Sequence, residues 1–167
     1  HGKAIRWILK DEKGKLIGRI AAFINEKKAF SFEQPTGGIG FIEGIDDYEV
    51  FKLLFDTAKK WLQENGMEAM DGPINFGEND SFWGLLIEGF THPSYGMNYH
   101  KPYYQTHFKK YGFHPVYEQI TNHLEVYKPF PERFTKIANW VASKPGYDFK
   151  HLSLKEFDKF AADFMEI

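Results

Sequence analysis

The sequence contains no cysteine, no long apolar run and no excess of basic residues. Without cysteine the chain cannot form disulfides, thiolate nucleophiles or Cys-ligated zinc and iron–sulfur sites. No apolar run approaches the roughly 18–20 residues of a membrane span, and HGKAIRWILKDEK has no signal-peptide pattern. We therefore expect a cytoplasmic protein with no membrane partner. Lys+Arg 21 against Asp+Glu 23 gives a net charge of −2, which disfavours nucleic acid as a partner.

Aromatic residues are abundant instead. They make up 18% of the 167 residues, with Phe 17, Tyr 9 and Trp 4, and 43% of the chain is hydrophobic. Aromatic side chains are common both in hydrophobic cores and in ligand pockets, so their number alone does not show which role they have here. The length favours one domain, or one domain plus a fragment.

The first forty-five residues predict a β-hairpin and a third strand. Apolar residues alternate with Arg6 and Lys10, a turn follows at Lys13-Gly14, and LIGRIAAFIN supplies the second strand. A polar stretch at 26–38, rich in Gly and Pro, predicts a loop that leads into the strand IGFIEGI.

A strand–helix–strand unit is predicted next. Asp46 and Glu49 form a capping pair for a helix over residues 47–65, whose apolar side chains fall on one face. MEAMDGPI, after the helix stop, predicts a strand parallel to the third one.

The second half of the chain alternates helices with extended segments. SFWGLLIEGF predicts a short helix over 81–90, YYQTHFKKYG a helix between Pro102 and Gly112, and HPVYEQITNHLEVY a strand over 114–127. In the tail, FPERFTKIANWVAS and the segment after Ser153 predict helices on either side of extended PGYDFKHL. The apolar stripe of the last helix needs a partner surface, for example in a homodimer.

A family resemblance rests on the segment HFKKYGFHPV, which is similar to the FYEKLGF helix–strand signature of the GNAT N-acetyltransferase superfamily. The chain also resembles an uncharacterised bacterial GNAT-like family with a GPxNF…ND…PYY…GF pattern, over roughly residues 15–127. The resemblance implies an α+β fold whose mixed sheet is built from a β-hairpin followed by β-α-β-α-β, with a helical C-terminal extension. It implies a GNAT-like core at 3–127 and a helix–strand–helix extension at 128–167 that begins a second GNAT-like unit.

The resemblance also implies transfer of an acyl group from acetyl-CoA or another acyl-CoA to an amine, with no metal. In GNAT enzymes the CoA lies in the splay between two strands, and backbone amides in a Q/R-x-x-G-x-G/A loop hold its pyrophosphate at the start of a helix. The corresponding residues 44–49 (GIDDYE) contain three acidic side chains, no Arg and no G-x-G. Carboxylates there stabilise the helix but repel a pyrophosphate, so this sequence lacks the usual donor loop.

The general acid of the resembled signature is a tyrosine that protonates the departing thiolate. Phe108 stands at that position and cannot donate a proton. Tyr104, one helical turn earlier, is the candidate catalytic residue, and core packing is its alternative role.

Candidate substrate-binding residues lie in the loop after the fourth strand and before the aromatic helix: Asn75, Phe76, Asn79, Asp80, Tyr99 and Tyr103. Polar residues at the carboxyl end of a parallel strand commonly contact ligands in open sheets. The alternative is that Asn75 and Asp80 serve turns and caps and that the tyrosines pack under the loop. His100, His107 and His114 recur every seven residues without metal-ligand spacing, so no metal site is predicted.

Two hypotheses follow. The first is an acyltransferase, or a ligand-binding relative, that takes a small-molecule substrate. The second is a catalytically silent GNAT-like domain that serves another domain or subunit through its C-terminal helix. A third, recognition of a peptide or an aminoacyl group, has no residue in its favour.

Overall fold

The computed structural model describes residues 2–31, 33–75 and 84–166. The chain divides into two compact units, residues 1–119 and residues 120–167, and each is treated by itself. Within the described ranges no helix is both long and apolar enough to cross a bilayer.

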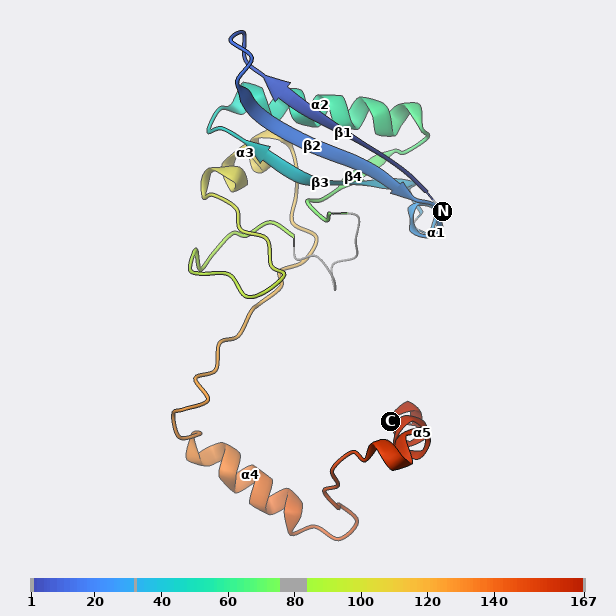
Figure 1. Ribbon diagram of the computed structural model, residues 1–167, viewed down its shortest axis with the longest axis vertical. Helices are drawn as coiled ribbons and strands as arrows, with labels where there is room; N and C mark the ends of the chain where they lie inside the picture. Colours follow the sequence, from blue (N-terminus) through green and yellow to red (C-terminus); the bar gives the residue numbers. More distant parts are fainter. Residues whose placement is uncertain (1, 32, 76–83, 167) are drawn as a thin grey trace. The chain divides into compact units, whose positions relative to one another are not determined.

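The first unit is an α+β arrangement built on an open four-stranded sheet in the order β1-β2-β3-β4 (Figure 1). Strands β1 (Gly2–Lys10) and β2 (Leu16–Asn25) form the predicted antiparallel hairpin. β3 (Thr36–Gly44) pairs antiparallel with β2, and β4 (Ala69–Asp71) pairs parallel with β3, so the sheet is mixed. The hairpin and the parallel strand–helix–strand unit are both confirmed.

The long helix α2 (Tyr48–Glu64) covers one face of the sheet. Its apolar side chains lie on one side of the helix, as the sequence predicted, and this side packs in the core. Its cap differs from the prediction. Asp47, not Asp46, is the N-cap, and its carboxylate accepts a hydrogen bond from the Glu49 N–H at 2.8 Å. The buried face of the helix comprises Val50, Phe51, Leu54, Phe55, Ala58 and Leu62.

Helix α3 (Tyr103–Tyr111) matches the predicted aromatic helix and ends at Gly112, which has a φ of 112°. Its buried residues are Tyr104, His107 and Phe108. Phe108 lies in the core, with ring centroids 4.8 Å from Phe55 and 4.9 Å from Phe113.

Several predicted elements are wrong. Residues 114–127 form no strand, and the apolar side chains of that segment, such as Val116 and Ile120, are exposed. Alternation alone does not make a strand, because a strand also needs a partner edge and a surface to cover. Residues 84–90 are not helical, whereas 81–83 lie outside the described residues. The loop predicted at 26–38 contains the short helix α1 (Glu26–Ala29) and the first residues of β3.

The second unit contains α4 (Glu132–Ala142), a 3-10 turn η1 (Leu154–Glu156) and α5 (Phe157–Glu166). Both tail helices were predicted, including the Ser153 cap, whose hydroxyl accepts from the Lys155 N–H at 3.3 Å. The strand predicted between them is not formed, since residues 145–152 are turn and irregular structure.

Candidate functional site

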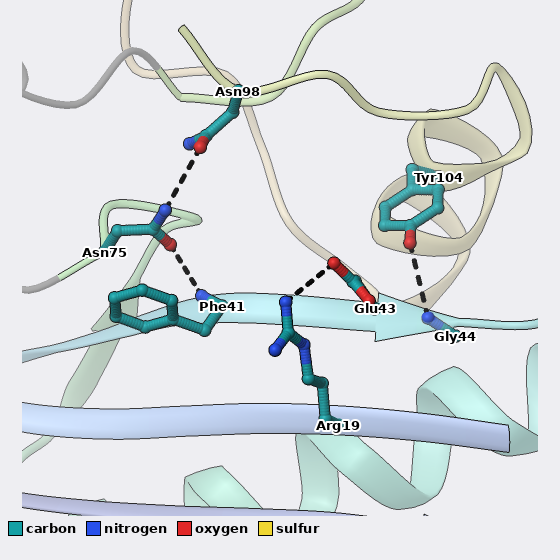
Figure 2. A network of polar contacts seen from close by, with 7 residues as sticks. All are labelled: Arg19, Phe41, Glu43, Gly44, Asn75, Asn98 and Tyr104. Atoms are coloured by element: carbon teal, nitrogen blue, oxygen red, sulfur yellow. Dashed lines mark hydrogen bonds and ion pairs between the residues drawn. The ribbon is translucent and has the colours of Figure 1, made fainter. Parts of the chain in front are cut away.

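The candidate site lies along the edge of β3 beyond its short pairing with β4. The parallel ladder joins only Thr36, Gly37 and Gly38 to β4, and the Ile74 N–H then donates to the Ile39 carbonyl at 2.9 Å. Further along this edge, at Phe41 and Gly44, side chains bond the strand's backbone groups (Figure 2).

A β-bulge lies in β3 where it pairs with β2, next to this edge. The β2–β3 register runs from Arg19 opposite Glu43 to Ala21 opposite Gly40, so two residues of β3 face a single residue of β2. Phe41 lies in the bulge with a φ of 49°, a conformation that costs free energy for a bulky side chain. The bulge turns the backbone groups of β3 away from the ordinary ladder.

Asn75 supports the bulge. Its side-chain oxygen accepts a hydrogen bond from the Phe41 N–H at 2.6 Å, and its side-chain N–H donates to Asn98 at 3.1 Å. Gly40 allows this approach, because a Cβ there would lie 2.4 Å from the Asn75 backbone nitrogen. The structure therefore places Asn75 at the predicted edge, where it binds protein backbone.

Two tyrosines of α3 meet the last residue of β3. The Tyr103 hydroxyl donates to the Gly44 carbonyl at 2.8 Å, and the Gly44 N–H donates to the Tyr104 hydroxyl at 3.3 Å. Because the Tyr104 oxygen accepts this bond, its own proton remains available to a further acceptor. Burial raises the pKa of Tyr104 and of Tyr103 above the ordinary value of tyrosine, so both phenols are protonated at neutral pH.

His100 contacts the same cluster and was not singled out by the sequence. It is buried, its ring lies 5.4 Å from that of Tyr104, and its Nδ1 accepts from the Leu86 N–H at 3.2 Å. This bond places the proton of the neutral ring on Nε2. Burial lowers the pKa of His100 to about 4, against a smaller opposing effect of Glu43, so the ring is neutral at pH 7.

A histidine–carboxylate contact links α3 to the residues just before α2. The Nε2 atom of buried His107 lies 3.0 Å from an oxygen of Asp46, whose side chain is 63% exposed. The Nδ1 atom is buried without a hydrogen-bond partner among the described residues. Asp46 was predicted as a cap, and sequence spacing could not reveal its partner 61 positions away.

A cross-strand ion pair lies beside the tyrosines, between Arg19 of β2 and Glu43 of β3, with 2.7 Å between nitrogen and oxygen (Figure 2). Both side chains are about half exposed or more, so this pair is accessible to a bound molecule. Tyr99 is also exposed, at 46%. The other predicted binding residues, Phe76, Asn79 and Asp80, lie outside the described residues.

The amino terminus of α2 does not fit a nucleotide diphosphate. Asp46, Asp47 and Glu49 lie at or next to it, and Asp47 occupies the Glu49 N–H. Carboxylates at this position repel phosphate oxygens and remove a backbone donor that would bind them. In the described ranges no group of three or more His, Asp or Glu side chains is placed to hold a metal ion.

A comparison with curated proteins finds one similar chain. Protein YghO of Escherichia coli (strain K12) is 38% identical over 109 residues, which cover 65% of this chain and 27% of YghO. The matched region thus spans about a quarter of the length of that relative. No family model matches the chain. No solved structure matches it either.

Proposed function

We propose that the first unit is a GNAT-like N-acyltransferase domain that transfers an acyl group from a thioester to an amine at the edge of β3. The observation that carries the proposal is the Tyr104 hydroxyl, which accepts from the Gly44 N–H at the end of the bulged strand β3 and has a proton left to donate. The helical half of the GNAT-like signature, which forms α3, and the element order up to α3 support the proposal, whereas the strand half of the signature is not formed.

The reaction would need one proton donor. The amine nitrogen attacks the thioester carbonyl carbon, the carbon–sulfur bond breaks, and the departing sulfur takes the phenolic proton of Tyr104. The proton lost by the amine passes to solvent, and a solvent proton restores the phenol. A raised pKa suits this role, because the phenol stays protonated until the thiolate forms.

Tyr104→Phe tests the assignment directly. It removes the hydroxyl and keeps the ring that packs at 4.9 Å against Phe51. We expect kcat for acyl transfer to an amine to fall about 10²-fold or more, the usual contribution of general acid catalysis. Tyr111→Phe is the matched control, because it removes a phenol of the same helix that donates to Asp56 at 2.8 Å and not to Gly44, and it should change kcat far less. Equal kcat for Tyr104→Phe and the parent protein would reject Tyr104 as the acid.

Thioester binding tests the function without turnover. Calorimetry with short and longer acyl thioesters at millimolar concentration should show saturable heat. Absence of heat with every thioester would reject the proposed acyltransferase.

A second candidate is a catalytically silent domain that acts through a partner, and the apolar side chains of the last helix favour it. Leu154, Phe157 and Phe164 are 84%, 55% and 79% exposed. Light scattering after size exclusion distinguishes the candidates: a silent partner domain should self-associate or bind another subunit, and a well-behaved monomer would count against it.

A further inference from the structure

The start of α2 carries the chemistry that decides which donor this domain can accept. Three acidic side chains lie at or next to this helix end: Asp46, Asp47 and Glu49. The Asp47 carboxylate already accepts the Glu49 N–H, and its backbone carbonyl accepts the Phe51 N–H at 3.3 Å. The local field therefore opposes an approaching anion where a bare helix end would attract one.

Two lysines that lie near this helix end are already engaged. Lys52 pairs with Asp56 at 2.6 Å, and the Lys110 nitrogen lies 3.7 Å from the centre of the Tyr48 ring. A diphosphate bound here would have to draw these cations away from their contacts. Two first-turn amides, those of Glu49 and Phe51, are therefore already bonded within the chain, and neither of these two lysines is uncommitted.

The neighbouring edge of β3 presents mostly uncharged groups. The phenols of Tyr103 and Tyr104 and the amide of Asn75 follow one another along it, and its charged pair, Arg19 and Glu43, is mutually neutralised. Neutral donors and acceptors suit the thioester and amide groups of a pantetheine-type arm.

We propose that the acyl donor is recognised through its thioester and the uncharged amide arm beside it, with no contribution from a nucleotide diphosphate. This inference rests on the proposed acyl transfer. The donor class is a thioester of a pantetheine-like thiol, whatever group that thiol is attached to.

Paired donors test the inference. Calorimetry on the whole 167-residue chain would compare acetyl-CoA with S-acetyl-N-acetylcysteamine, which has the thioester and one amide but no phosphate. We expect dissociation constants within about threefold of each other. A site that reads the diphosphate through charged hydrogen bonds gains about 1.5–3 kcal/mol, or roughly tenfold to a hundredfold in affinity. A preference of tenfold or more for acetyl-CoA would therefore overturn the inference.

A charge variant provides the second test. Asp47→Ser with Glu49→Gln removes two negative charges and keeps a capping oxygen at position 47. It should tighten acetyl-CoA binding about threefold to tenfold and leave the phosphate-free thioester unchanged. The matched control is Glu64→Gln with Glu68→Gln, the same charge change at and just after the other end of this 17-residue helix, roughly 25 Å away.

The outcomes separate the two proposals. Tighter binding of both thioesters by the charge variant, or of neither, would overturn the inference, since the carboxylates would then not discriminate between donors. Failure of the parent chain to bind either thioester would reject the acyltransferase itself and the donor assignment with it.

Discussion

Both units of this chain contain helices with apolar and aromatic side chains, but among the described residues only the first unit buries them. In residues 2–119 aromatic side chains fill a core in which Phe51 and Phe55 have no exposed surface. In residues 120–166 no described side chain is buried, although α4 and α5 have apolar faces comparable with that of α2. Apolar periodicity therefore marks a helix in both units, whereas burial of the apolar face, which supplies most of the stability of a short helix, requires a second surface.

The largest expected contrast is between two phenylalanines. Phe55→Ala should lower the free energy of unfolding by about 3–5 kcal/mol, because it removes a fully buried ring that contacts four other rings. Phe157→Ala in α5, where the residue is 55% exposed, should stay within about 0.5 kcal/mol. Urea denaturation followed by tryptophan fluorescence measures both. A comparable loss for Phe157→Ala would mean that α5 is buried in solution.

Buried and exposed histidines should also differ in their effect on the pH dependence of stability. The folded pKa of His100 is about 4 and its ordinary value is 6.5, so the unfolded chain binds more protons between these values. Stability is fully present above pH 6.5 and falls as the pH drops towards 4, by up to about 3 kcal/mol. His100→Gln should flatten that part of the stability profile. His151→Gln in the exposed second unit is the control and should leave the slope intact.

A smaller effect is expected at the bulge. Asn75→Ala leaves the Phe41 N–H without its acceptor and should cost about 1–3 kcal/mol. Asn75→Asp keeps that acceptor and loses only the donor to Asn98, so it should cost less. Thermal melts give the order, with exposed Asn139→Ala in α4 as the control. If the alanine and aspartate variants melt together, the bond to Phe41 does not support the bulge.

Exposed ion pairs should contribute similarly small coupling energies in the two units. A double-mutant cycle on Arg19 and Glu43 should give a coupling of about 0.2–1 kcal/mol, because both side chains are exposed. The pair of Glu132 and Lys136 within α4, 3.2 Å apart, should give about 0.3–0.5 kcal/mol. A much larger coupling for Arg19 would indicate that its surroundings are shielded from water.

The elements predicted correctly from the sequence are those specified by local patterns. The hairpin turn after Lys10, the one-sided apolar face of α2 and the Gly112 stop of α3 each depend on residues within a few positions of one another. The strand at 114–127 failed because its alternating pattern says nothing about whether a partner edge is available.

The candidate site was predictable only in part, for the same reason. Asn75, Tyr103 and Tyr104 stand in the quoted motifs and do meet the edge of β3. His100 and the pairing of His107 with Asp46 depend on packing between segments more than ten residues apart, which no local pattern encodes.

The polar contacts along β3 have one more consequence. A strand edge with free N–H and C=O groups invites pairing with strands of other molecules, and a bulge or a side chain bound to those groups prevents it. Asn75 takes the Phe41 N–H, and the two tyrosines take both backbone groups of Gly44. The side chains bound along this edge thus keep it from recruiting another chain into an aggregate.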